Sequence, residues 1–266
     1  MTIAQTLEQS RKIVIKIGSN TLAKEDGTIN IDFMNSFANQ CNKLIAKGKQ
    51  LVIVSSGAQV AGISTLHRWT RKKDIHYRQA LCAIGQVELM QQWREAFLTN
   101  GIHIGQLLIT KDDFGDKQRT LNMRNTLFTL VDEGVIPVIN ENDSVSFEEI
   151  SIGDNDNLSA LTAILWGADA LILFSDIDGV YDKNPKEHAD AKLIELVTDI
   201  EELKATISMD SKSDFGTGGM VTKIEAAQKV LDYGIAMILA NGGIDQVLDK
   251  LVNAEAKGTV FVPTEQ

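Results

Sequence analysis

The chain has 266 residues, of which 44% are hydrophobic and 23% charged, an ordinary composition for a globular protein with one large domain or two lobes. Its net charge of −10 argues against a general nucleic-acid surface, which needs a basic footprint. No stretch approaches the roughly 18 uninterrupted apolar residues of a membrane helix. The N-terminus also lacks the apolar core of a signal peptide. We therefore expect a cytoplasmic protein that binds neither nucleic acid nor membrane.

Short runs rich in Val, Ile and Leu alternate along the chain with longer segments of helical composition. The predicted strands are 12–18, 50–57, 104–110, 135–140, 170–176 and 235–241. The predicted helices are 33–47, 78–99, 117–133, 158–166, 221–233 and 244–253. The strand runs are continuously apolar rather than alternating, which is typical of strands covered on both faces. The alternation predicts an α/β fold with a mostly parallel sheet and helices on both sides.

The chain divides near residue 167 into a first part with four strands and a second part with two clear strands. No linker rich in Pro, Gly or Ser separates them. We expect a single domain in which two lobes, about 1–167 and about 168–266, share one sheet. Cys41 and Cys82 lie in helical segments without partners at metal-binding spacing and are expected to be reduced, buried thiols.

Small and polar residues follow five of the predicted strands. They are residues 16–19, 55–57, 140–143, 175–176 and 241–243. Ligands of open α/β sheets bind in the crevice outside the carboxyl ends of the strands. Five polar ends in one chain therefore favour a single composite site.

The stretch GTGGMVTK at 216–223 is the strongest candidate for a phosphate-binding loop. It fits neither the P-loop pattern nor the dinucleotide fingerprint. Its three glycines immediately precede a helical pattern, so that the backbone can approach an anion at a helix N-terminus while Lys223 reaches it. The alternative is a flexible turn before a helix, with Lys223 on a solvated face.

Lys16 is unusual because it lies within the apolar run 13–17, where a lysine is costly unless it meets a counter-charge. A phosphate ligand is the favoured interpretation, and an edge lysine that reaches solvent is the alternative.

The segment 153–160, GDNDNLSA, offers Asp154, Asn155 and Asp156 at the expected start of a helix. A helix cap explains one of these residues. Asp154 and Asp156 could position lysines or a metal-bound nucleotide.

Two further strand ends carry polar groups that suit charged ligands. The carboxylates and amides of 140–143 can surround an ammonium group, although turn chemistry explains them as well. The hydroxyls and N–H groups of 55–58 suit a carboxylate. No His or Cys lies at any strand end, so a Ser–His–Asp or Cys–His hydrolase lacks its base.

With these motifs the chain resembles the amino acid kinase family. The matching segments are VIKIGSN (14–20), VSSGAQVAG (54–62), IPVINENDSV (136–145), GDNDNLSA (153–160), SDIDGVYDKNP (175–185) and GTGGMVTKIEAA (216–227). NEND followed by GDNDNLSA resembles the members that act on glutamate. The resemblance implies a three-layer α/β/α sandwich with an amino-acid lobe and a nucleotide lobe. It also implies phosphoryl transfer from ATP to the side-chain carboxylate of L-glutamate, the first step of proline biosynthesis.

The resemblance also assigns roles to residues. Lys16 and Lys223 would stabilise the transferring phosphoryl group, and Asp156 would position both lysines. The residues implied for glutamate are Ser56, Gly57, Asn140, Asp143, Asp154 and Asn155. Those implied for ATP are Lys16, Ser175, Asp176, Thr217, Gly218, Gly219, Met220, Val221, Thr222 and Lys223. Mg²⁺ would be held mainly by the ATP phosphates, and no protein metal site is expected.

Other expectations rest on the resemblance alone. They are a homo-oligomer, feedback inhibition by L-proline at the glutamate site and a glutamyl-phosphate reductase partner. The chain ends soon after the run TVFV, so we expect a form without the C-terminal PUA domain of many members. Ser175 stands where members often have Thr. Relatives acting on aspartate, acetylglutamate or a nucleoside monophosphate, and a non-catalytic amino-acid sensor of the same fold, remain alternatives.

Overall fold

A computed structural model describes residues 1–67, 70–71, 74–145, 154–185, 187–208 and 219–263. In this part of the chain a single eight-stranded sheet has the order β3-β4-β2-β1-β5-β7-β8-β6. The strands are β1 (Lys12–Ile17), β2 (Gln50–Ser55), β3 (Ile104–Ile109), β4 (Ile136–Glu141), β5 (Ala170–Ser175), β6 (Leu196–Val197), β7 (Ala236–Asn241) and β8 (Thr259–Phe261). Only the β7–β8 pair is antiparallel among the recorded strand pairs. The predicted mostly parallel α/β sheet is therefore confirmed.

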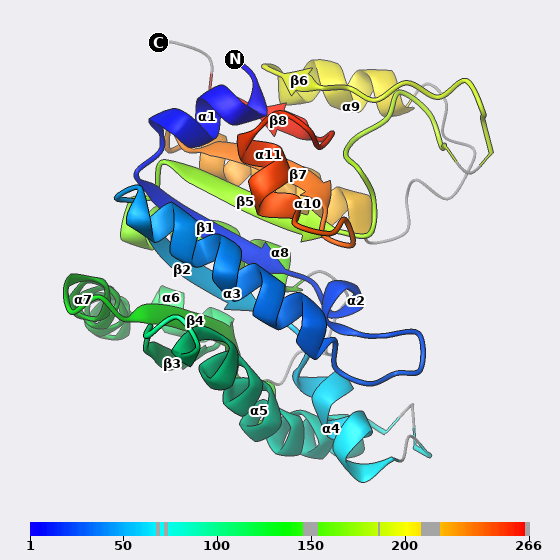
Figure 1. The fold of residues 1–266 in the computed structure, drawn as a ribbon. Coiled ribbons are helices and arrows are strands. Elements are labelled where there is room, and N and C mark those ends of the chain that lie inside the picture. Colours follow the sequence, from blue (N-terminus) through cyan, green and yellow to red (C-terminus); the bar gives the residue numbers. More distant parts are fainter. Residues whose placement is uncertain (68–69, 72–73, 146–153, 186, 209–218, 264–266) are drawn as a thin grey trace.

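Helices cover both faces of this sheet (Figure 1). One face packs against α1 (Ile3–Gln9), α3 (Ile31–Ala46), α5 (Ile75–Leu98) and α11 (Val247–Val252). The other packs against α7 (Lys117–Asp132), α8 (Asp154–Trp166), α9 (Ile200–Ser208) and α10 (Gly219–Leu231). The helices α2 (Ser19–Leu22), α4 (Ala58–Leu66) and α6 (Lys111–Gly115) follow the ends of β1, β2 and β3. Within the described residues, no helix combines the length and apolarity that crossing a bilayer requires.

Strand β1 shows how the sheet separates two hydrophobic cores. Ile13, Ile15 and Ile17 belong to the core beneath α3 and α5, whereas Val14 belongs to the core beneath α8 and α10. Successive side chains of a strand point to opposite faces. Lys16 therefore shares the face of Val14, toward α8 and α10, at the carboxyl end of the strand.

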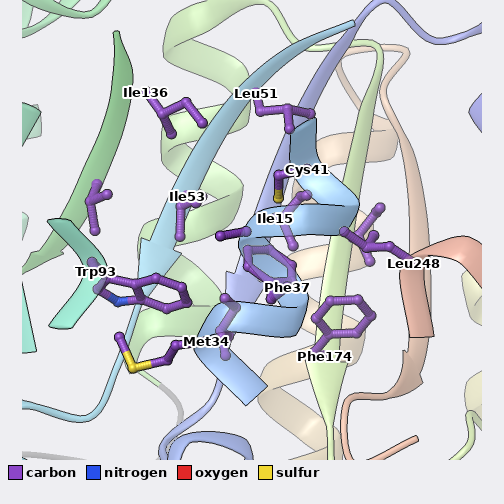
Figure 2. Close-up of a cluster of buried hydrophobic side chains, with 14 of the residues drawn as sticks. Ile15, Met34, Phe37, Cys41, Leu51, Ile53, Trp93, Ile136, Phe174 and Leu248 are labelled. Carbon is purple, nitrogen blue, oxygen red and sulfur yellow. The ribbon is translucent and has the colours of Figure 1, made fainter. Parts of the chain in front are cut away.

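The core beneath α3 is dominated by aromatic contacts around Phe37 (Figure 2). Its ring centroid lies 5.8 Å from that of Trp93 on α5 and 6.3 Å from that of Phe174 on β5, both in edge-to-face geometry. Edge-to-face pairs are a favourable arrangement of aromatic quadrupoles. This core also contains Cys41 and Cys82, which are buried and free, as predicted.

Several element boundaries differ from the sequence prediction. Helix α5 begins at Ile75 rather than at 78, because the Asp74 side chain caps it by accepting from the Tyr77 N–H at 3.1 Å. Helix α8 begins at Asp154 rather than 158, so the acidic and amide residues form its first turn. Helix α11 begins only at Val247, after Gln246 in the left-handed region. The prediction also lacked the helices α1, α2, α4, α6 and α9 and the strand β6.

Helices α4 and α5 cross at two glycines. A Cβ atom at Gly85 would lie 1.8 Å from the Ala58 carbonyl oxygen, and one at Gly62 would lie 2.0 Å from the Leu81 carbonyl oxygen. Both contacts are with backbone atoms and cannot be relieved by a rotamer change. Helix α4 (AQVAGISTL) lacks an amphipathic pattern. It packs against α5 through its small residues Ala58 and Gly62.

The substitution Gly85→Ala is expected to destabilise the protein by about 3 kcal/mol, since one helix must move to admit the methyl group. The urea midpoint, measured by circular dichroism, tests this. Gly115→Ala is the matched control, because a Cβ atom at Gly115 meets nothing within 4 Å. Equal midpoints for the two variants would contradict the close helix crossing.

Candidate functional site

The polar strand ends predicted from the sequence lie along one edge of the sheet. Strands β1, β2, β4, β5 and β7 run parallel, so that their carboxyl ends share that edge. Helix α4 begins directly after β2, and Gly57 at its N-cap has a φ of 106°, in the left-handed region that favours glycine. Free N–H groups at helix N-termini make such an edge suitable for anions.

Asp156 lies between the two predicted lysines. Its Oδ1 is 2.6 Å from Lys16 Nζ and its Oδ2 is 3.0 Å from Lys223 Nζ. The side chain of Asp156 has no exposed surface, and those of Lys16 and Lys223 are 8% and 11% exposed. The three residues come from β1, α8 and α10, so the structure joins segments from both halves of the sequence at one carboxylate.

Thr222 and the start of α10 complete this cluster. Thr222 Oγ1 donates to Asp156 Oδ2 at 3.1 Å, and Lys223 Nζ also donates to the Gly219 carbonyl oxygen at 3.1 Å. Lys223 is thus directed back toward the start of its helix. This geometry supports an anion-binding role over a solvated lysine.

The charges at the cluster shift two pKa values. Burial lowers the pKa of Lys16, although the carboxylates of Asp156 and Asp176 oppose that shift. Burial alone would raise the pKa of Asp156, but the attraction of Lys16 and Lys223 outweighs it and lowers that pKa. The Asp156 carboxylate is therefore ionised at neutral pH.

Of the remaining residues expected at the nucleotide, the structure describes Ser175, Asp176, Met220 and Val221. Ser175 Oγ donates to Asp176 Oδ1 at 3.1 Å, and the Gly242 N–H donates to the Ser175 carbonyl oxygen at 2.8 Å. Met220 is partly buried against the core of α8 and α10, whereas Val221 is exposed. Thr217 and Gly218 lie outside the described residues.

A second group of predicted residues forms a chain of amides beside the cluster. Asn155 Nδ2 donates to Ser56 Oγ at 2.7 Å and to Asn140 Oδ1 at 3.2 Å. Asn140 Nδ2 in turn donates to Gln86 Oε1 on α5 at 2.8 Å. The structure thus brings Ser56, Asn140 and Asn155 together, and it places Asn155 next to Asp156 on α8.

Ser56 is supported from the hydrophobic core. Its N–H donates to the Ile17 carbonyl oxygen at 3.0 Å, and its own carbonyl oxygen accepts from Ser55 Oγ at 2.9 Å. Ser55 Oγ also accepts from the indole N–H of Trp93 at 2.9 Å. The buried Trp93 therefore holds the end of β2 in place from the hydrophobic core.

Asp143 borders a cavity of about 380 Å³ between α5, β3 and the end of β4, which Cys82 and Gln86 also line. Burial, and secondarily the neighbouring Asp143 carboxylate, raise the pKa of the Cys82 thiol well above its usual value, so it stays protonated. Of Asp154, the described part of the structure fixes only the backbone, and its side chain lies outside the description.

The sequence prediction missed Gln86, and it named Thr222 as an ATP contact but not as a partner of Asp156. Gln86 could have been noticed as a glutamine one turn after Cys82 on the buried side of a helix that otherwise presents apolar residues there. Among the described residues, no group of three or more His, Cys, Asp or Glu side chains could hold a metal ion.

Comparison with known proteins extends these observations. A family model described as the amino acid kinase family matches residues 11–241. Glutamate 5-kinase of Alkaliphilus metalliredigens is 60% identical over 259 residues, which are 97% of this chain and 98% of that protein. Glutamate 5-kinase of Treponema pallidum is 45% identical over 96% of this chain and 97% of that protein.

Solved structures share the fold at low sequence identity. UMP kinase from Ureaplasma parvum superposes with a TM-score of 0.68 at 17% identity, covering 96% of this chain and 99% of that chain. Carbamate kinase from Giardia lamblia, bound to AMP-PNP, gives a TM-score of 0.67 at 15% identity, with coverage of 96% and 99%. These likenesses confirm the three-layer α/β/α architecture.

Proposed function

Since the chain belongs to the amino acid kinase family, we propose that it transfers a phosphoryl group from ATP to the side-chain carboxylate of L-glutamate. The product is L-glutamyl 5-phosphate, and the reaction is the first step of proline biosynthesis. The choice of glutamate as acceptor is supported by the identity of 60% to a glutamate 5-kinase along 98% of that relative's length.

The observation that carries the reaction type is the buried carboxylate of Asp156, in contact with a lysine of β1 and a lysine of α10. The side-chain carboxyl of glutamate has a pKa of about 4.3, so it is already a nucleophile at neutral pH. No general base is needed. The reaction must bring two anions together while negative charge spreads over the phosphoryl oxygens. Cations held in position stabilise that charge.

Each lysine has a role that follows from its element. Lys16, on the central strand β1, is held by Asp156 at the junction of the two groups of polar residues. Lys223, near the start of α10, follows the glycine stretch and donates to the Gly219 carbonyl oxygen, so it would contact the phosphates of ATP. An amino-acid sensor would need no such pair, which weighs against a non-catalytic protein.

ATP and its Mg²⁺ would occupy the ends of β5 and α10. Ser175, Asp176 and 217–223 are the proposed ATP contacts, with Lys16 shared between ATP and the reacting carboxylate. Mg²⁺ would be carried mainly by the ATP phosphates. Glutamate would lie against Ser56, Gly57, Asn140, Asp143, Asp154 and Asn155.

Further proposals rest on the family resemblance. L-Proline would inhibit by competing at the glutamate site, since it carries the same α-carboxylate beside a charged nitrogen. The enzyme would act as a homo-oligomer and deliver its labile acyl phosphate to a glutamyl-phosphate reductase. The boundary between the substrate and nucleotide lobes near residue 167 also stays a prediction.

The acceptor is tested by measuring ADP formation with ATP, Mg²⁺ and each of glutamate, aspartate, acetylglutamate and UMP. Glutamate is expected to give the highest kcat/KM. Acetylglutamate should be poor because it lacks the α-ammonium group. Turnover with another acceptor and none with glutamate would overturn the proposal.

Asp143→Ala is expected to raise the KM for glutamate about 10- to 100-fold, because a charge-assisted contact with the α-ammonium group is lost. The KM for ATP should stay the same. Ser144→Ala, which alters the same cavity, is the control. A change confined to the ATP KM would show that the amino-acid site lies elsewhere.

A further inference from the structure

The orientation of the amide chain is set by one backbone group. The Glu141 N–H donates to Asn140 Oδ1 at 2.9 Å, and a backbone N–H can only donate. Asn140 must therefore present its oxygen to that side and its Nδ2 to Gln86. Gln86 must then offer its oxygen to Asn140, and Asn155 must offer its nitrogen to Asn140 Oδ1.

This order leaves one unused atom at each end of the amide chain. In the described part of the protein, neither Gln86 Nε2 nor Asn155 Oδ1 has a hydrogen-bond partner, although both atoms are buried. Buried polar atoms without partners are rare because they cost free energy, so such atoms at a binding site indicate a missing ligand. One of them is a donor and the other an acceptor.

A donor and an acceptor on either side of Asn140 match the two charged groups on the α-carbon of an amino acid. Gln86 is separated from Asp156 and the lysines by Asn140, whereas Asn155 adjoins Asp156 in α8. The reacting side-chain carboxylate must lie at the lysines. The α-carboxylate, at the other end of the substrate, is therefore the group that reaches Gln86.

We propose that Gln86 is a specificity-determining residue whose Nε2 donates a hydrogen bond to the α-carboxylate of the substrate, while Asn155 Oδ1 accepts from the α-ammonium group. This inference rests on the proposed function and extends it to the recognition of a free α-carboxylate. Gln86 thereby contacts the substrate as well as holding Asn140.

The test compares glutamate with its α-carboxamide, which keeps the reacting side-chain carboxylate but replaces the α-carboxylate by a neutral amide. The variant is Gln86→Glu. Its carboxylate still accepts from Asn140 Nδ2, so the amide chain is retained, but the donor becomes an acceptor that repels the α-carboxylate. The ratio of kcat/KM for glutamate to kcat/KM for the α-carboxamide is measured by ADP formation.

Wild-type protein is expected to prefer glutamate, and Gln86→Glu should lower that ratio about 10-fold or more. The change should appear mainly in the KM for the acceptor, with the KM for ATP unchanged. Gln106→Glu is the matched control, because it introduces the same charge into the same cavity outside the amide chain and should keep the wild-type ratio. Gln86→Met is neutral and of similar length, and it provides the same comparison if Gln86→Glu does not fold.

An unchanged ratio in Gln86→Glu, or an equal drop in Gln106→Glu, would overturn the proposal, because a purely structural role lowers activity toward both substrates alike. Absence of glutamate turnover in the wild-type protein would instead remove the proposed function itself. The two failures are thus distinguishable.

Discussion

Lys223→Ala is expected to lower kcat about 10²- to 10³-fold, the effect of removing one prearranged donor from developing transition-state charge. Lys223 Nζ is 3.0 Å from Asp156 and is directed by the Gly219 carbonyl oxygen, so its position is fixed before the ligand arrives. Asp156 keeps Lys16 and Thr222 as partners in the variant, and the fold should therefore persist. Single-turnover rates at saturating ATP and glutamate measure the effect on chemistry alone.

Lys229→Ala is the matched control for this result. Lys229 lies on the same helix and also bonds to α8, but its partner is the Asn157 amide oxygen rather than Asp156. It should keep nearly the wild-type kcat. Wild-type kcat in Lys223→Ala, or an equal loss in both variants, would refute the role assigned to Lys223.

Asp156→Asn is expected to reduce the free energy of unfolding by about 3–5 kcal/mol and to abolish most activity. The substitution keeps the shape of the side chain but removes its negative charge. Among the described residues, Asp156 is the only ion-pair partner of Lys16. Leaving a buried charge without its partner has a cost of this size. Urea unfolding with a check that the m-value is unchanged measures it.

The destabilisation should depend on pH in a defined direction. The pKa of Asp156 is lowered from 3.8 in the folded protein, so the carboxylate contributes stability above that pH and loses it as pH falls through the folded-state pKa. The difference between wild type and Asp156→Asn should therefore be full at neutral pH and shrink below pH 3.8. A difference that grew toward acid would contradict the ionised cluster.

Asp190→Asn controls for the loss of an ion pair as such. Asp190 pairs with Lys183 but is 76% exposed, and exposed pairs contribute little to stability. Its urea midpoint should match wild type.

The double variant Lys16→Met with Asp156→Leu should recover part of the stability lost in Asp156→Asn, because a buried pair can be replaced by apolar side chains, but it should recover no activity.

Much of the site could be read from the sequence because buried charges are conspicuous. Lys16 interrupts an apolar strand, and Asp156 lies in a segment with more capping residues than one helix needs. The structure confirms that both are buried and in contact. Helix boundaries were harder to predict, since the starts of α5 and α11 depend on the Asp74 cap and on the backbone of Gln246.

The sequence by itself determined the six longest strands and the residues at the carboxyl ends of five of them, since burial on both faces demands continuous apolar runs and leaves polar groups only at the edge. Only the tertiary structure decided the strand order, the crossing of α4 and α5 at Gly62 and Gly85, and the place of Gln86 in the amide chain. These contacts join residues far apart in the chain, and the hydrogen bond from Asn140 to Gln86 spans 54 positions. Local propensity carries no information about such a pair, because its energy exists only once both elements have packed on the sheet.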